Sequence, residues 1–174
     1  SEMCIRDRGS GTQEVSTPAG KFGSFEIAST GTVNLNNVVR FGRDLKHTSG
    51  TITYNSTTME FNSYGSQQTS IIDYQLQAAP DVTFAIFSSE IASITGTLDV
   101  DGTLSNIQPG KIQGGGTILA SGDVNWNSGS KGENFELELD GSGTQVVSGV
   151  STAFMGSLKV NSTGNVRFEG DILL

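Results

Sequence analysis

Acidic residues give this sequence most of its capacity for chemistry, because a pair of carboxylates can cleave a polysaccharide by acid and base catalysis. They are densest in one stretch, which contains Glu133, Glu136, Glu138 and Asp140. The last three of them alternate with apolar residues, namely Phe135, Leu137 and Leu139. Such alternation places the carboxylates together on the outer face of a β-strand. We therefore predict a solvated strand face here, and no catalytic residue.

A second acidic group, Asp99-Val100-Asp101-Gly102, is similar to the start of a calcium loop. An EF-hand loop needs its glycine at the sixth position, with further oxygen ligands after it. Here the glycine is fourth, and Thr103-Leu104 follows it. The glycines at 114–116 also lack the spaced aspartates of calcium-binding β-rolls. The pattern favours a strand followed by a turn, and predicts no metal ligand.

Histidine and cysteine each occur once, at His47 and Cys4. A zinc site or a nucleophilic triad needs partners that a single histidine in a cysteine-poor chain does not have. We expect His47 to lie in a surface loop. The sequence thus predicts no cofactor; it leaves enzymatic activity uncertain and favours a protein without it.

Composition indicates a folded chain with no affinity for nucleic acid. The 174 residues carry a net charge of −8, and the ten Lys and Arg residues are scattered singly. Nucleic-acid binding requires a basic stripe that neutralises phosphates. No apolar run approaches the length of a membrane span.

An internal repeat must position all of these residues. Gly23 to Leu35, GSFEIASTGTVNL, matches Gly156 to Phe168, GSLKVNSTGNVRF, at six of thirteen positions. Weaker copies surround Val82 and Val124, so that the repeat valine recurs at 33, 82, 124 and 166, with a longer first interval and two equal ones after it. A Gly-Ser/Thr-Gln-x-x-Ser signature recurs at 11–16, 65–70 and 143–148. Unequal spacing around a constant motif indicates insertions into loops between fixed strands.

Strands of period two, separated by small polar turns, predict an all-β fold. Three short strands with their turns take up roughly 20 residues, so the interval from Val82 to Val124 corresponds to two coils of a β-solenoid. We predict a right-handed parallel β-helix, with β-sandwich repeats as the alternative. The four repeat valines should then stack in one inward column, and Leu35, Phe84, Trp126 and Phe168 in another. Asp81 and Asp123 should form a polar ladder with Thr32 and Asn165.

Three segments depart from the repeat or limit it. Residues 1–8, SEMCIRDR, resemble translated sequencing-adapter sequence from a metagenomic assembly, and we set them apart from the fold. Residues 9–174 form a single solenoid region that we expect to be truncated at both ends. Residues 85–120 match the repeat weakly, so the sequence leaves open whether they form an extra coil or an irregular insertion, with one helical turn within 87–96.

The stretch 134–174 resembles the β-strand repeats of very large surface and secreted proteins of bacteria, adhesin-like proteins of Bacteroidetes among them. Its matching elements are the Gly-Thr-Gln turn at 143–148, the strand 158–160, the Ser-Thr-Gly turn at 162–164, and Val-x-Phe with Gly-Asp at 166–171. The resemblance implies a parallel β-helix that is displayed outside the cell.

Three functions remain open on this basis. The first is a structural or adhesive segment of a cell-surface or secreted protein, whose partners are glycans or other surface molecules and further repeats of the same chain. The second is part of a carbohydrate-active, pectin-lyase-like enzyme. The third is an ice-binding solenoid, suggested by Thr51-Ile52-Thr53 and weakened by Leu98-Asp99-Val100.

Overall fold

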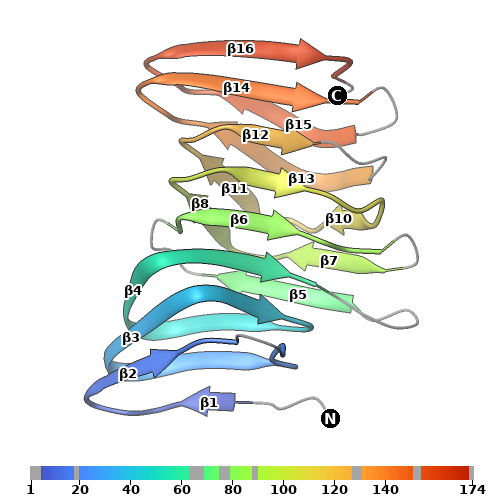
Figure 1. Cartoon of the computed structure of the whole chain (residues 1–174). Helices are drawn as coiled ribbons and strands as arrows, with labels where there is room; N and C mark the ends of the chain where they lie inside the picture. Colours follow the sequence, from blue (N-terminus) through green and yellow to red (C-terminus); the bar gives the residue numbers. More distant parts are fainter. Residues whose placement is uncertain are drawn as a thin grey trace.

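A computed structural model describes residues 5–17, 20–62, 69–74, 79–87, 90–126, 131–150 and 154–172. All of the regular structure in these ranges is β-strand, and the strands pair in parallel. In Figure 1 the nearer strands β6, β12, β14 and β16 run to the right, whereas the fainter β5 and β7 behind them run to the left. Because the chain rises from N to C as it turns, the solenoid is right-handed.

The strands are β1 (Ile5–Asp7), β2 (Thr12–Val15), β3 (Phe25–Phe41), β4 (Leu45–Phe61), β5 (Thr69–Tyr74), β6 (Asp81–Phe84), β7 (Ile91–Ile94), β8 (Thr97–Val100), β9 (Leu104–Asn106), β10 (Lys111–Gln113), β11 (Thr117–Ala120), β12 (Val124–Trp126), β13 (Lys131–Leu139), β14 (Thr144–Gly149), β15 (Phe154–Val160) and β16 (Asn165–Gly170). Residues 5–7, which the sequence sets apart, pair with 25–27 as the first strand of the stack.

Each coil contributes to three stacks of parallel strands, which we call faces I, II and III. Face I contains β1, β5, β7, β10 and the first parts of β3, β4, β13 and β15. Face II contains β2, β8, β11, the middle of β3 and β4, and the ends of β13 and β15. Face III contains the ends of β3 and β4, and then β6, β9, β12, β14 and β16.

The register confirms the predicted coil length and excludes the sandwich. Ile91 pairs with Lys111, which in turn pairs with Lys131, so two successive coils have the expected length. Strands joined by hairpins would pair in antiparallel fashion, and these are parallel. The coil length is not constant, because the step from Thr32 to its partner Thr51 is shorter than the step from Leu45 to its partner Ile72.

Apolar columns run up the inside of the stack, as the alternation of the strands requires. On face III one column consists of Val39, Met59, Val82, Leu104, Val124, Val147 and Phe168. Beside it the rings of Phe41, Phe61 and Phe84 stack with centroids 5.5 and 5.4 Å apart. All three rings are fully buried, so this column combines apolar burial with favourable ring stacking.

The predicted columns are only half right. Val82 and Val124 do share a column two coils apart, with Leu104 between them. Val33, however, pairs with Ile52 on face II, and Val166 lies over Gln145.

The second predicted column shows the same mixture. Phe84 and Trp126 are aligned, with Asn106 between them. Leu35 instead pairs with Val15 and Tyr54, and Phe168 belongs to the valine column, over Val147.

The two best copies of the repeat are offset by one face, which explains why Val33 misses the column, whereas Val166 lies on face III two residues out of register with Val124 and Val147. Residues 23–35 run from face I to face II, whereas residues 156–168 run from face II to face III. The motif specifies a strand, a corner and a second strand. Nothing in such a unit distinguishes one corner of the coil from another.

The described residues of the stretch 85–120 belong to regular coils, so this stretch is not an irregular insertion. β7, β8 and β9 pair with β10, β11 and β12, with the same step along the chain in each pair. Within the stretch 87–96 that was predicted to hold a helical turn, Ile91–Ile94 is instead strand β7, and residues 88 and 89 lie outside the described residues. The alternation of Tyr74-Gln75-Leu76 also predicts a strand, but residues 75 and 76 lie outside the described residues.

Candidate functional site

The repeated motif builds a hydrogen-bonded corner between faces. In the first copy the Ser29 hydroxyl donates to the carbonyl of Gly9 at 2.7 Å and accepts from the Gly31 amide at 2.9 Å. A Cβ on Gly31 would lie 2.2 Å from the carbonyl oxygen of Gly11. Only glycine fits so close to the backbone of the coil below.

The second copy builds the same corner with the same bonds. The Ser162 hydroxyl donates to the carbonyl of Gly141 at 2.6 Å and accepts from the Gly164 amide at 3.1 Å. Each Ser-Thr-Gly corner therefore sits on a Gly-Ser-Gly corner one coil below, at 9–11 or 141–143. The repeat unit thus joins one coil to the next.

Gln145 extends this corner downward. Its side chain is 1% exposed, donates to the carbonyls of Ala120 and Gly122 at 2.7 and 3.0 Å, and accepts from the Gly141 amide at 3.0 Å. Three hydrogen bonds satisfy a buried amide that would otherwise be costly. The identical GSGTQ pentapeptides at 9–13 and 141–145 are the sequence pattern that marks this hydrogen-bonded corner.

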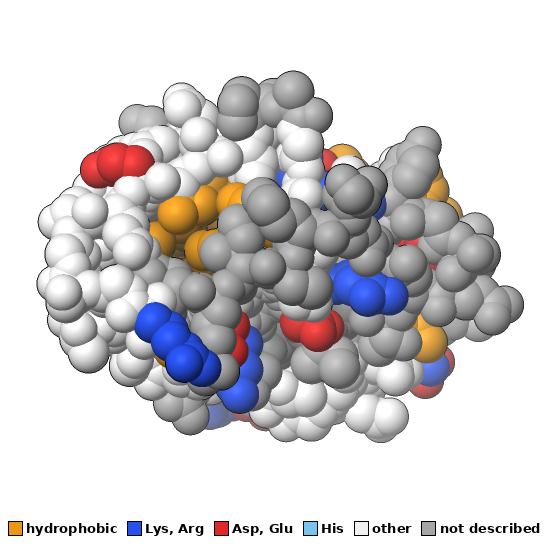
Figure 2. Space-filling model, turned by 90° about the horizontal axis from the view of Figure 1, so that it is seen from below, with side chains coloured by type: hydrophobic (Ala, Val, Ile, Leu, Met, Phe, Trp, Pro, Cys, Tyr) orange, Lys and Arg blue, Asp and Glu red, His pale blue; other side chains and the backbone are white. Residues whose placement is uncertain are grey.

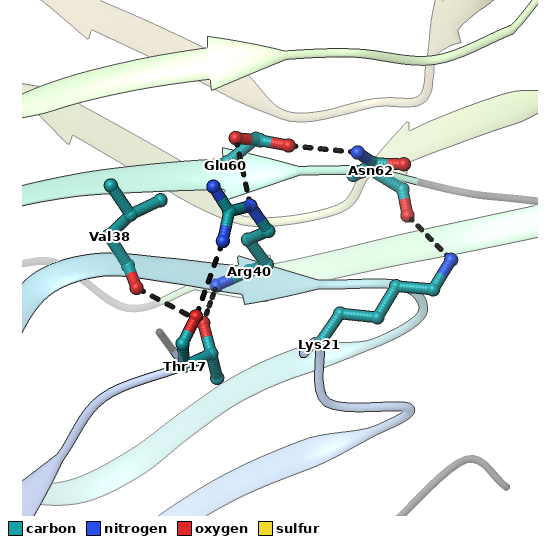
Figure 3. Close-up of polar contacts among 6 residues, drawn as sticks. All are labelled: Thr17, Lys21, Val38, Arg40, Glu60 and Asn62. Atoms are coloured by element: carbon teal, nitrogen blue, oxygen red, sulfur yellow. Dashed lines mark hydrogen bonds and ion pairs between the residues drawn. The ribbon is translucent and has the colours of Figure 1, made fainter. Parts of the chain in front are cut away.

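A polar network in the lower coils ties three successive coils together (Figure 3). Thr17 accepts from the Arg40 amide at 2.9 Å, and its hydroxyl donates to the Val38 carbonyl at 3.0 Å. The Arg40 guanidinium donates to the Thr17 carbonyl at 3.2 Å and to Glu60 at 3.3 Å. Asn62 donates to the other Glu60 oxygen at 2.8 Å.

This network positions no nucleophile beside a base, and most of its bonds link one coil to its neighbour. Lys21 completes it by donating to the Asn62 carbonyl at 3.3 Å. Neither Thr17 nor Arg40 was predicted from the sequence, because the partners lie on different coils and belong to no motif.

Replacement of Thr17 by valine is expected to lower the free energy of unfolding by about 1–3 kcal/mol. The reason is that the Arg40 amide loses its hydrogen-bond acceptor, the hydroxyl of the buried Thr17. Thermal unfolding measures the effect. Thr17→Ser, which retains the hydroxyl, should restore most of the lost stability. If the valine and serine variants melt at the same temperature, this hydrogen bond does not support the coil interface.

The acidic group of β13 is less solvated than its alternation predicts. Glu138 is 9% exposed and pairs with Lys159 of the coil above at 3.0 Å. Asp140 is half-buried, and its Oδ1 accepts no hydrogen bond from the residues that the structure describes. The prediction of a solvated strand face was therefore wrong for Glu138, because outward side chains in a solenoid are covered by those of the next coil.

Asp99 and Asp101 lie near this group. Burial raises the pKa of Asp99, and the carboxylates of Asp101 and Asp140 raise it further. Burial also raises the pKa of Asp140; a backbone hydrogen bond opposes this rise, and the carboxylates of Glu138 and Asp101 add to it. Nevertheless, no three His, Cys, Asp or Glu side chains in the described part of the chain are arranged to hold a metal ion.

Asp99→Asn should raise the melting temperature at pH 7, because the folded state then no longer holds a disfavoured charge. In the wild type the folded pKa lies above the ordinary value of 3.8, so the folded state binds the proton more tightly and stability rises as the pH falls through this pKa. The advantage of the variant should shrink towards pH 4. An advantage that is independent of pH would contradict this origin.

The other residues singled out from the sequence, His47, Asp81 and Asp123, contact the backbone of the coils. His47 lies in β4 rather than in a loop; it is 6% exposed, and its Nε2 is 3.2 Å from the carbonyl oxygen of Gly50. Asp81 accepts from the Thr103 amide at 2.7 Å, and Asp123 accepts from the Val146 amide at 2.8 Å. These aspartates thus share a column on face III.

Thr32 and Asn165, the other two members of the predicted polar ladder, lie outside that column. Thr32 pairs with Thr12 and Thr51 on face II, and Asn165 pairs with Thr144. The ladder is therefore shorter than predicted, because Thr32 lies on another face and Asn165 lies on face III two residues out of register with Asp123.

Face II of the lower coils carries a regular outward array. Thr12, Thr32 and Thr51 are aligned in one column, and Glu14, Asn34 and Thr53 in the next. The Glu14 carboxylate accepts from the amides of Asn34 and Asn36, each at 2.6 Å. These hydrogen bonds lower the pKa of Glu14.

No described segment forms a helix that is both long and apolar enough to cross a membrane. Comparison with known proteins gives no relative from which a function could be assigned, so only the fold is available for that purpose. No family model matches the chain, and neither a curated protein nor a solved structure matches it. The chain is thus a parallel β-solenoid of repeated coils, with polar contacts directed mainly from one coil to the next.

Proposed function

We propose that this solenoid is a rigid structural and adhesive segment of a bacterial cell-surface or secreted protein. The observation that supports this most strongly is the duplicated corner, in which Ser29 and Ser162 make the same hydrogen bonds, each to the coil below its own. A chain that repeats one coil-joining corner can become longer by adding coils. Its stability is then a sum of contacts between neighbouring coils. Rods of this kind hold a binding surface away from the cell.

Glycans and other cell-surface molecules are the proposed partners, and further repeats of the same chain the proposed neighbours. The polar array on face II offers closely spaced hydroxyl and amide groups for such contacts. Thr12, Thr51 and Thr53 are exposed there, and Asn55 donates to Asn36 at 2.9 Å beside them.

The test is binding of the purified chain to a glycan array, combined with the sequence of the complete gene. We expect binding that is lost in a Thr12→Tyr/Thr51→Tyr/Thr53→Tyr variant, whose bulky rings cover face II. A variant with Thr83→Tyr on face III is the matched control. A gene without export signal, or binding that is equal in both variants, would count against the proposal.

Ice binding is a second candidate, favoured by the aligned column of Thr12, Thr32 and Thr51. Three threonines in the register of a parallel sheet repeat at about 4.8 Å, and such a rigid hydroxyl row suits a regular lattice. Thermal hysteresis that disappears in Thr32→Tyr would support it. No hysteresis in the wild type at high concentration removes this candidate.

A further inference from the structure

Lys21 extends across one complete coil to the coil beyond it. Phe22, its neighbour in the chain, pairs with Phe41 of the next coil, and the backbone amide of Asn62 donates to the Phe41 carbonyl from the coil after that. The Lys21 amine nevertheless donates to the carbonyl of Asn62 at 3.3 Å. This contact therefore joins two coils that are separated by a third.

Gly42, in the intervening coil, leaves room for this lysine. A Cβ on Gly42 would lie 3.0 Å from Cδ and 3.1 Å from Cε of Lys21, closer than ordinary van der Waals contact. The aliphatic part of Lys21 thus packs along the glycine, while its amine reaches the polar groups beyond. The intervening coil therefore directs the amine towards Asn62.

Glu60 orients the side-chain amide of Asn62 (Figure 3). Asn62 Nδ2 donates to Glu60 Oε1 at 2.8 Å, whereas Glu60 Oε2 accepts from Arg40 Nε at 3.3 Å. Asn62 Oδ1 is buried and accepts no hydrogen bond from the residues that the structure describes. Among these residues the amide is thus held through its nitrogen, against a carboxylate whose side chain is 20% exposed.

The contact between Lys21 and Asn62 differs from the ion pairs of other lysines. Lys111 and Lys159 pair with carboxylates at 2.6 and 3.0 Å. Figure 2 shows the molecule from below, where Lys and Arg side chains are interspersed with Asp and Glu side chains. A carboxylate only pairs with an amine, whereas a side-chain amide can exchange its ammonia for the amine. The position of Lys21 at an asparagine therefore allows a covalent reaction.

We propose that Lys21 and Asn62 form an intramolecular isopeptide bond that spans the intervening coil. Nζ of Lys21 attacks Cγ of Asn62 as a nucleophile; a bond between Nζ and Cγ forms, and the bond between Cγ and Nδ2 breaks. Glu60, which already contacts Nδ2, carries protons from Nζ to Nδ2. The lysine ammonium and the asparagine amide thus become one secondary amide and one ammonium ion, without a further reactant.

The geometry favours this reaction because both reacting groups are held at one asparagine. Lys21 and Glu60 approach Asn62 at different groups, the backbone carbonyl and the side-chain nitrogen. Only Cα and Cβ of Asn62 separate its two carbonyl carbons, so rotation about the last bonds of Lys21 moves the amine from one to the other. Such proximity replaces an encounter between separate molecules. The cross-link goes beyond the proposed function and does not depend on it.

Mass spectrometry of the intact, purified chain tests the proposal. We expect a mass below that of the sequence by one ammonia molecule. A tryptic digest should contain a branched peptide that joins residues 9–40 to residues 47–111, because trypsin does not cleave after a lysine whose amine is acylated. A wild-type chain with its full sequence mass overturns the proposal. Since the branched peptide is sought in the wild type, this test does not depend on the folding of any variant.

Three variants identify the reacting groups. Lys21→Arg retains the charge, but its guanidinium stays protonated and does not attack, and Asn62→Ala removes the amide; both should keep their full sequence mass. Glu60→Gln retains an acceptor for Asn62 but carries no proton, so its cross-linked fraction should grow more slowly by about 10²–10⁴-fold. Lys159→Arg is the matched control, because Lys159 pairs with Glu138, and it should lose ammonia as the wild type does.

Formation of a succinimide at an asparagine also releases ammonia, but it needs no lysine. Ammonia loss that persists in Lys21→Arg therefore overturns the proposal, as does a digest of the wild type that lacks the branched peptide. Circular dichroism of each variant establishes that a missing cross-link reflects the substituted group and not an unfolded chain.

Discussion

Val124→Asp is expected to unfold the described coils cooperatively. Val124 is fully buried on face III, where it lies between Leu104 and Val147. An unpaired carboxylate in an apolar column costs several kcal/mol, a large part of the roughly 5–15 kcal/mol that stabilises a typical domain. Because coils are stabilised by their neighbours, the loss at this position uncouples the coils on either side. Circular dichroism during heating and in urea measures the effect.

Asn125→Asp is the control for this substitution. It introduces the same charge in the same strand, but Asn125 faces outward, where its side chain accepts from Ser148 at 2.9 Å. We expect its melting temperature to stay close to that of the wild type. If Val124→Asp also melted close to the wild type, the inward column would not carry the stability assigned to it.

Phe61→Ala should strongly destabilise the fold. Phe61 is fully buried in β4, and its ring lies 5.5 Å from that of Phe41 and 5.4 Å from that of Phe84. Truncation of a buried phenylalanine lowers the free energy of unfolding by about 3–5 kcal/mol, and here it also removes two ring contacts. Urea denaturation gives the difference directly.

Phe61→Leu separates the two contributions. Leucine fills most of the volume but stacks on neither ring, so its stability should fall between those of the wild type and the alanine variant. Phe87→Ala serves as the exposed comparison, since Phe87 is 37% exposed. Equal losses for Phe61→Ala and Phe87→Ala would show that the ring column adds nothing to the fold.

In the part of the chain that the structure describes, the coil-joining contacts explain why the carboxylates and the histidine form no catalytic or metal-binding group. Glu60 accepts from Arg40 and Asn62, Glu138 binds Lys159, and His47 is buried beside Gly50. In each case a polar side chain meets a partner on an adjacent coil or close by in its own coil. This use of polar groups is typical of a stack whose outward columns are crowded by the coils above and below.

The sequence by itself determined the local structure. Strict alternation of apolar and polar residues predicted the strands, and the interval between Val82 and Val124 predicted two coils, as observed with Leu104 between them. The Ser-Thr-Gly turns also lie at corners, as predicted. These features depend only on short stretches of the chain and their spacing, which is why a sequence pattern reveals them.

Only the tertiary structure decided which residues lie over one another. The alignment of distant coils depends on the summed length of all intervening loops, and the coils differ in length, as the pairs Thr32 with Thr51 and Leu45 with Ile72 show. Val33 therefore lies on face II, and Val166 lies on face III two residues out of register, over Gln145 instead of Val147. The same non-local stacking buries Glu138, since the side chains that cover it come from the coils above and below and not from its own strand.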